Sequence, residues 1–424
     1  MTKLPITIIA YMAIFSFFTH AQDLKFARKT IGKLCSPEFH GRGYTKNGDS
    51  IAAFYITRHL KKFKLKNFSG SYIQDFSISA NTFSEKISVS LNKSDKLSPG
   101  YDYLIAASSG SIEGTFPVIV MDYKLLDYPK KLKKITRDSL SKSFILIDTI
   151  NLKNKGFKDA YKDIINYNIL GAKGIIQLEY KNLIYVPSTF EQKFPIVKIS
   201  RQVIPDTLKS ISLKIKNSLK KEYHTRNIIG FVEGEIDSFI VFSAHYDHIG
   251  EMGEGVYFPG ANDNASGTTM VLNFAKYFSR LKKKPKYSIA FMFFSAEEMG
   301  LLGSSYYVKN PLFPLSKIKF LINLDMVGSG DKGITVVNGT KNKNQFDKLV
   351  EINNNNEYLA AVKIRGAAAN SDHYPFAEKD VNSVFIYTLG EYSEYHNIFD
   401  KAENLPLNEY EDLFKLLLGF VKSF

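Results

Sequence analysis

The chain has 424 residues, of which 44% are hydrophobic and 23% are charged, and this length and composition fit a globular protein of two domains. The formal net charge is +14, yet the lysines are scattered and lack the interleaved aromatic residues of a nucleic-acid groove, so no nucleic-acid partner is expected. The single cysteine, Cys35, excludes an intrachain disulfide and a cysteine-based zinc site, which leaves histidine and carboxylate side chains as metal ligands.

Residues 1–21 have the pattern of a secretory signal peptide. Lys3 provides a positive start, Ile6–Phe18 is an apolar run too short to span a bilayer, and Thr19-His20-Ala21 is a small-residue cleavage site. No later apolar run reaches membrane length. We therefore expect a mature chain without an integral membrane span that is secreted or periplasmic.

Two stretches of different character follow. Residues 22–84 begin with an amphipathic helical pattern and contain a second helical run at Asp49–Phe63. Residues 85–205 carry one helix-like segment, Lys158–Leu170, many short β-type runs and no cluster of metal-ligand residues. The β-type runs are Ile87-Ser88-Val89, Pro117–Met121, Phe144–Ile147, Gly174–Leu178 and Pro195–Ile199. We expect residues 85–205 to form an inserted β-rich domain.

Residues 206–424 alternate strand-like and helical runs, which indicates an α/β layered fold. Four apolar runs are typical of buried strands: Phe239–Ala244, Ile289–Phe294, Phe320–Leu324 and Val384–Leu389. Each run is followed within a few residues by ionisable side chains. Because buried strands of an α/β sheet present functional groups at their carboxyl ends, we expect the chemistry here.

Two motifs come first in this stretch. In His245-Tyr246-Asp247, the imidazole can bind zinc through one nitrogen while the other nitrogen donates to the carboxylate. The turn at residues 260–267 is rich in Gly, Asn and Ser and surrounds Asp263, whose two oxygens could bridge two metal ions. A helical run, Thr268–Phe278, follows the turn. Taken singly, the histidine could be a surface histidine and the aspartate a helix N-cap.

Three further motifs follow the later strands. The adjacent carboxylates of Glu297-Glu298 repel each other unless a cation or proton lies between them, and one can bind metal while the other acts as a general base. An acidic first helical turn would also give this pair. Asp325 follows a buried strand, where an unpaired carboxylate is costly. His396 follows Tyr395, whose hydroxyl could donate to a developing oxyanion.

In this order, the motifs resemble the co-catalytic di-zinc exopeptidase family, which includes bacterial leucyl aminopeptidase, aminopeptidase Y, glutamate carboxypeptidase and the transferrin receptor. The resemblance covers residues from about 225 to the end of the sequence. It implies two zinc ions per chain, bridged by Asp263. The other implied ligands are His245 and Asp325 for the first zinc ion, and Glu298 and His396 for the second.

The resemblance also implies roles for three more residues and an activity. Glu297 would be the general base, Tyr395 a transition-state donor and Asp247 the partner of His245. The implied protein is a secreted, zinc-dependent aminopeptidase that hydrolyses peptides with a free N-terminus.

The implied fold is a three-layer α/β/α sandwich with a mixed sheet. The motif His40-Gly41-Arg42-Gly43 resembles the opening of this family, and the Asp263–Asn264 peptide is expected to be cis. The insert resembles a protease-associated domain at Gly171–Ile176 and Phe194–Ser200. Such a domain would cover the substrate cleft or mediate contacts.

Three rival functions stay open. A carboxypeptidase with the same metals would need a cationic pocket, for which Arg365 is a candidate. A glutaminyl cyclase would use one zinc ion and a Trp-rich pocket, but this chain has no Trp. A receptor-like relative without activity could lose its metal ligands. This chain keeps all five predicted metal ligands and the predicted general base, Glu297. The sequence does not indicate an oligomeric state.

Several other residues near these motifs are ambiguous. His40, His59, His224 and His248 are not expected to bind metal. Ser371-Asp372-His373 fits either a helix cap or a family segment near the site, and the two interpretations have equal weight.

Overall fold

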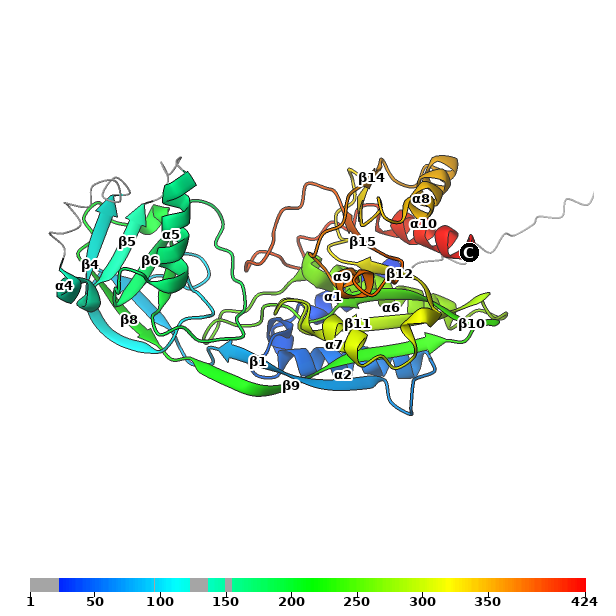
Figure 1. Cartoon of the computed structure of the whole chain (residues 1–424), viewed down its shortest axis with the longest axis horizontal. Helices are drawn as coiled ribbons and strands as arrows, with labels where there is room; N and C mark the ends of the chain where they lie inside the picture. The colour runs from blue at the N-terminus through cyan, green and yellow to red at the C-terminus, as the bar shows by residue number, and fades with distance from the viewer. Residues whose placement is uncertain (1–22, 95, 123–135, 149–154) are drawn as a thin grey trace, which may run out of the picture.

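The computed structural model describes residues 23–94, 96–122, 136–148 and 155–424, and the expected signal peptide lies outside them. Two sheets lie at opposite ends of the long axis, joined by the long strands β1 (Ile73–Thr82) and β9 (Ser218–Val232) (Figure 1). Among these residues, no helix is both long enough and apolar enough to cross a membrane.

The larger sheet has eight strands and carries the predicted site. Its strands run in the order β1, β9, β11 (Tyr287–Phe294), β10 (Ile236–His245), β12 (Ile318–Leu324), β15 (Ser383–Thr388), β13 (Ile334–Val337) and β14 (Val362–Ile364). The central strands β11, β10, β12 and β15 are parallel, while β9 pairs antiparallel with β11 and β13 pairs antiparallel with β15. The four predicted buried strands are therefore confirmed, and they are neighbours in one mixed sheet.

Helices cover both faces of this sheet, which makes the predicted three-layer sandwich. They are α1 (Leu24–Leu34), α2 (Gly48–Lys62), α6 (Gly267–Phe278), α7 (Leu302–Lys309), α8 (Lys343–Asn356), α9 (His373–Ala377) and α10 (Tyr410–Lys422). Alternate residues of β10 point to opposite faces, as strand geometry requires. Phe242 stacks on Phe274 of α6 with ring centroids 4.1 Å apart, whereas Val241 packs in a second apolar cluster with Tyr307 of α7 and Phe376 of α9.

The N-terminal helices form where the sequence predicts them. In α1, Ala27, Ile31 and Leu34 recur at helical spacing and are buried against the larger sheet's domain. Asp23 caps this helix, because its carboxylate accepts a hydrogen bond from the Phe26 N–H at 2.8 Å.

The second sheet has seven strands and belongs to the inserted region. Its order is β2 (Ser88–Leu91), β8 (Ser210–Ile215), β4 (Ile112–Asp122), β5 (Phe144–Asp148), β6 (Gly174–Glu179), β7 (Ile196–Ser200) and β3 (Tyr103–Ile105). Two helices, α4 (Arg137–Lys142) and α5 (Lys155–Tyr167), accompany it. All five predicted β-type runs fall on its strands. β8 follows the expected boundary at residue 205, so in the structure this sheet extends to Ile215.

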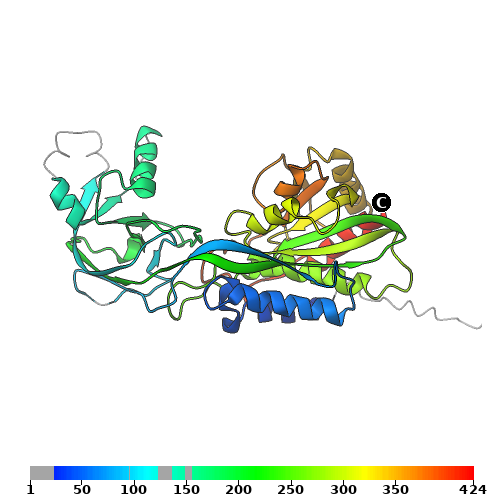
Figure 2. The ribbon, with the colours of Figure 1, turned by 60° about the horizontal axis from the view of Figure 1, so that its bottom comes forward.

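The strand pair β1–β9 connects the two sheets. It runs as a twisted antiparallel ribbon from the larger sheet to the insert (Figure 2), with register from Ile73 opposite Ile228 to Thr82 opposite Ser218. This pair was not among the predicted elements.

Candidate metal centre

The predicted ligands meet at the carboxyl ends of the central strands. β10 lies between β11 and β12, and its last residue, His245, is in register with Phe294, the last residue of β11. Glu297 and Glu298 follow β11 by a few residues, and Asp325 follows β12 directly. Strand adjacency therefore brings together side chains that lie far apart in the sequence.

Asp263 lies between two groups of possible ligands. Its Oδ1 is 3.3 Å from His245 Nε2, and its Oδ2 is 3.0 Å from His396 Nε2. Around His245, the Asp325 Oδ1 atom is also 3.3 Å from Nε2. Around His396, the Glu298 Oε2 atom is 3.0 Å from Nε2. The two oxygens of one carboxylate thus face two separate histidine–carboxylate pairs, as a metal-bridging residue requires. The Asp263–Asn264 peptide is cis, as expected.

The adjacent glutamates have opposite electrostatic settings. Burial, with the charges of Asp325 and Glu298, raises the pKa of Glu297 well above its usual range although His245 opposes this. Burial also acts to raise the pKa of Glu298, but His396 and His248 outweigh it and lower that pKa to about 2. Opposite pKa shifts in adjacent carboxyl groups are typical of sites in which one carboxyl group transfers a proton and the other binds a cation in its charged form.

The donor set fits divalent metal ions that prefer nitrogen and oxygen ligands. His396 Nε2 lies close to two carboxylates without hydrogen-bond geometry to either, and its Nδ1 is also buried without a partner. Two sets of side chains each bring their ligand atoms within 4.8 Å of one another: His248, Asp263, Glu298 and His396, and His245, Glu297 and Asp325. Buried carboxylates gathered in this way need a cation, and histidine with carboxylate is the set that zinc accepts.

The two imidazoles respond strongly to these carboxylates. Burial opposes the charged imidazolium of His396, yet Glu298 and Asp263 raise its pKa to about 11. Burial likewise opposes charge on His245, yet Asp325 and Glu297 hold the pKa of this group well above its usual range. The carboxylates around both rings therefore favour the protonated imidazolium when no metal is bound.

Polar groups behind the ligands fix their orientation. The His245 Nδ1 atom is 3.2 Å from the Asp247 main-chain carbonyl, its hydrogen-bond partner, and 3.7 Å from the Asp247 carboxylate that the sequence suggested. Asp247 in turn accepts a hydrogen bond from the Tyr44 hydroxyl at 2.8 Å. Ser371 donates to Asp325 Oδ2 at 2.8 Å, which places the ambiguous Ser371-Asp372-His373 segment beside the site. Such partners orient metal ligands.

Sequence reasoning missed two residues that hold the backbone around Asp263. The buried Arg42 donates to the carbonyls of Gly260 at 2.8 Å and Asp263 at 3.2 Å. Asp400 accepts hydrogen bonds from the N–H groups of Asn262 and Asp263 through its carboxylate. Arg42 belongs to the motif His40-Gly41-Arg42-Gly43, and its presence in this motif is the signal that the sequence offers for it. The sequence gives no comparable signal for Asp400. An acid that accepts hydrogen bonds from backbone N–H groups needs no particular residues around it in the sequence.

His248 also lies closer to the site than expected. Its ring is fully buried, and its Nδ1 is 2.8 Å from Glu298 Oε1. The spacing from His245 gives a weak signal for this, since His248 follows the same strand end. In the structure, it contributes to the group around Glu298 and His396.

A cavity of about 300 Å³ opens beside the two ligand groups. Its lining residues are Asp263, Glu297, Glu298, Asp325, Met326, Arg365, Asn370, Phe385, Tyr387 and Tyr395. Tyr395 stacks on the His396 ring at a centroid distance of 3.8 Å and stays partly exposed to the cavity. The carboxylates outnumber the single cation, Arg365, so the cavity favours a positively charged group near the ligands.

The inserted domain contacts the loop that carries His396. The Tyr185 N–H donates to the His396 carbonyl at 2.9 Å. The Tyr185 ring is buried and stacks on Phe258 of the larger domain, with centroids 4.9 Å apart and planes at 8°. A segment of the insert therefore supports one of the predicted ligands.

The mixed sheet brings two groups of possible metal ligands to the carboxyl ends of its strands, which makes this edge a candidate metal-dependent active site. Residues 227–421, a little under half of the chain, match the model of Peptidase family M28. The matched segment contains all five predicted ligands and Glu297.

Similar proteins extend the comparison beyond that segment. Aminopeptidase YwaD of Bacillus subtilis is 29% identical over 332 residues, which is 73% of this chain and 68% of the relative. Leupeptin-inactivating enzyme 1 of Streptomyces exfoliatus is 30% identical over 38% of this chain, but the match spans only 35% of that enzyme. The structure of a zinc aminopeptidase from Bacillus subtilis superposes with a TM-score of 0.69 and 23% identity, covering 94% of each chain, so the fold extends through the insert.

Proposed function

We propose that the protein is a zinc-dependent aminopeptidase that removes N-terminal residues from peptides. The observation that carries this proposal is the placement of Asp263, with one oxygen toward His245 and the other toward His396, beside a cavity rich in carboxylates. The relatives named as aminopeptidases support the same reaction. Two zinc ions per chain fit the two ligand groups.

His245, Asp325 and Asp263 would hold the first zinc ion, and Glu298, His396 and Asp263 the second. Zinc held here would supply Lewis-acid chemistry, activating water and polarising the scissile carbonyl. Every other part of the reaction belongs to side chains of the cavity.

Glu297 acts as the general base in this proposal. Its Oε2 is 4.0 Å from His245 Nε2, so it faces the ligands without being needed for either predicted set. It accepts a proton from the attacking water and returns it to the leaving amine. Tyr395 donates its hydroxyl hydrogen to the oxyanion that develops on the scissile carbonyl.

The cavity and the names of the relatives together favour an aminopeptidase over a carboxypeptidase. Once Asp263, Glu298 and Asp325 hold zinc, a free α-amine could bind beside the second zinc ion, with Glu297 as the acid of the cavity wall that holds no metal. A substrate carboxylate would have Arg365 as the one cationic side chain in the lining of the cavity. We infer that cleavage is restricted to residues with a free N-terminus.

A panel of aminoacyl-p-nitroanilides tests the function directly. Zinc-loaded protein should release p-nitroaniline, chelation should abolish release and added zinc should restore it. Absence of hydrolysis across the panel in protein that contains two zinc ions would rule out the proposal. We also propose that the protein is exported from the cell or to the periplasm. N-terminal sequencing of protein recovered from the medium or periplasm tests this separately.

A further inference from the structure

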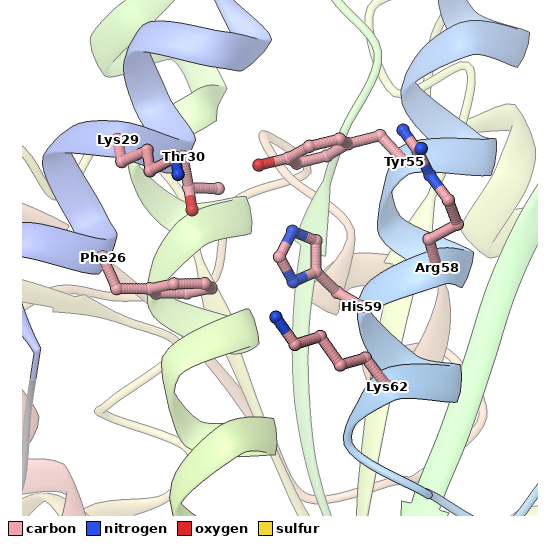
Figure 3. Close-up of a pocket in the computed structure, with 7 residues that line it drawn as sticks. All are labelled: Phe26, Lys29, Thr30, Tyr55, Arg58, His59 and Lys62. Atoms are coloured by element: carbon pink, nitrogen blue, oxygen red, sulfur yellow. The ribbon is translucent and has the colours of Figure 1, made fainter.

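A second cavity lies between the N-terminal helices, separate from the catalytic cavity. Its volume is about 380 Å³, and it is lined by Phe26, Lys29, Thr30, Tyr55, Arg58, His59 and Lys62. The first three residues come from α1 and the others from α2 (Figure 3). None of these residues lines the catalytic cavity.

The charge of this cavity is entirely positive. Three of its residues are cations, Lys29, Arg58 and Lys62, and none of its residues is acidic. In the part of the chain that the structure describes, these three cations form no ion pair with an acid. Asp23, which precedes α1, is already bonded to the Phe26 N–H and paired with Lys276 at 2.7 Å. The cavity therefore has uncompensated charge for an anion of more than one negative charge.

Three of the lining residues, Phe26, Tyr55 and His59, have aromatic rings. The His59 ring packs edge-to-face against Phe26 at 5.4 Å and against Tyr55 at 4.7 Å between centroids. Figure 3 shows the three rings around the space between the two helices, with the Lys62 side chain next to His59. Rings arranged in this way favour a planar apolar group, which can stack or pack edge-on.

His59 has unused hydrogen-bonding capacity here. Its Nδ1 is shielded from solvent and has no hydrogen-bond partner. Burial, together with the charges of Lys62 and Arg58, lowers the pKa of His59 to about 4, so the ring is neutral at neutral pH.

We propose that the cavity between α1 and α2 binds a phosphate monoester carried on a planar heteroaromatic ring, of the size of a nucleoside monophosphate. Lys29, Arg58 and Lys62 bind the phosphate, and Phe26, Tyr55 and His59 contact the ring. The volume of the cavity is within the range of small-molecule sites. The site is independent of the zinc ligands.

Isothermal titration calorimetry of the zinc-loaded protein tests this with three probes: AMP, adenosine and inorganic phosphate. AMP should bind at least about tenfold more tightly than either fragment, because only AMP offers both the ring and the dianion. AMP affinity should fall as salt increases, since the contacts to phosphate are electrostatic. Absence of AMP binding, or equal affinity for AMP and phosphate, would overturn the proposal.

Charge-reversal variants assign the binding to this cavity. R58E/K62E should lose at least about tenfold in AMP affinity while hydrolysing aminoacyl-p-nitroanilides at the wild-type rate. The control K193E/K209E makes the same change in net charge at exposed lysines of the insert and should bind AMP as the wild type does. If R58E/K62E keeps wild-type AMP affinity, the phosphate is bound elsewhere, for example at zinc, and the proposal is wrong. Equal losses in both double variants would also contradict it, because they would reflect net charge alone.

Discussion

The guanidinium of Arg42 donates to the main-chain carbonyl of Asp263 at 3.2 Å, although the two residues lie on different parts of the chain. The same side chain donates to the carbonyls of Tyr246 at 2.9 Å and Pro259 at 2.7 Å. One buried arginine thus ties the strand end that carries His245 to the turn that carries Asp263. The bridging carboxylate depends on this backbone for its position.

Arg42→Lys should therefore weaken zinc binding by roughly 10–100-fold, the usual effect of losing a group that orients metal ligands. A lysine cannot supply as many donors, and each buried carbonyl left without one costs about 1–3 kcal/mol of folding free energy. Zinc affinity by competition with a chelator and thermal unfolding would measure both effects. Arg226→Lys, at a partly buried arginine that packs on Phe54, is the control and should leave zinc affinity unchanged. Wild-type zinc affinity in Arg42→Lys would exclude this positioning role.

The second prediction separates the general base from the ligands. Glu297→Gln should keep both zinc ions and the fold but lower kcat by on the order of 10²–10⁴-fold, because proton transfer and ligation rest on different residues. Glu298→Gln should instead lose zinc, since a neutral amide is a poor ligand. Metal analysis combined with kcat distinguishes the two. A Glu297→Gln enzyme that retains zinc and wild-type kcat would show that another group is the base.

The sequence predicted the positions of these acids because they follow strands that are buried on both faces and read as continuous apolar runs. β10, β11, β12 and β15 were all found in this way, and the strand ends carry His245, Glu297, Glu298 and Asp325. Strand order was not predictable in the same way, because pairing is decided by contacts between distant segments.

The features that the sequence did not predict depend on contacts between segments that lie far apart in the chain. β1 and β9 are long, partly exposed strands whose pairing crosses the insert, so no short-range pattern indicates it. Arg42 and Asp400 act on backbone groups, and any backbone can accept or donate in the same way. His248 was not expected to bind metal, and only the fold shows its contact with Glu298.

The third prediction concerns the insert. Tyr185→Ala should lower zinc affinity by roughly tenfold or more, because the segment that bonds to the His396 carbonyl would lose its stacking on Phe258. Tyr167→Ala, at an exposed tyrosine of α5, is the control and should have no effect. Zinc titration of both variants checks this. Equal zinc affinity in Tyr185→Ala and the wild type would mean that the insert does not support His396.

The fourth prediction is proton release when zinc binds. The raised pKa values of His396, to about 11, and of His245 mean that both imidazoles are protonated in the metal-free protein at neutral pH. Because zinc binds only the neutral ring, binding should release about one proton from each, and zinc affinity should rise with pH. Titration calorimetry in buffers of different ionisation enthalpy measures the release.

The same shifts set the pH dependence of the metal-free protein. A histidine whose pKa is higher in the folded state contributes stability that is complete below its unfolded value and is lost as pH rises through the folded value. For His396, this window runs from about 6.5 in the unfolded chain to about 11. The metal-free protein should lose stability across this range.

Zinc binding without proton release would contradict the assignment of His245 and His396 as zinc ligands.

The measurement that tests the central claim most directly is mass spectrometry of one hexapeptide, presented free, N-acetylated and C-amidated, to zinc-loaded protein. Blocking the amine removes the group that we propose binds beside the second zinc ion, at a cost of about 1–3 kcal/mol. We therefore predict sequential loss of N-terminal residues from the free and amidated peptides and cleavage of the acetylated peptide at least about tenfold more slowly. Loss of C-terminal residues, or equal cleavage of the acetylated peptide, would contradict an aminopeptidase while leaving the di-zinc site intact.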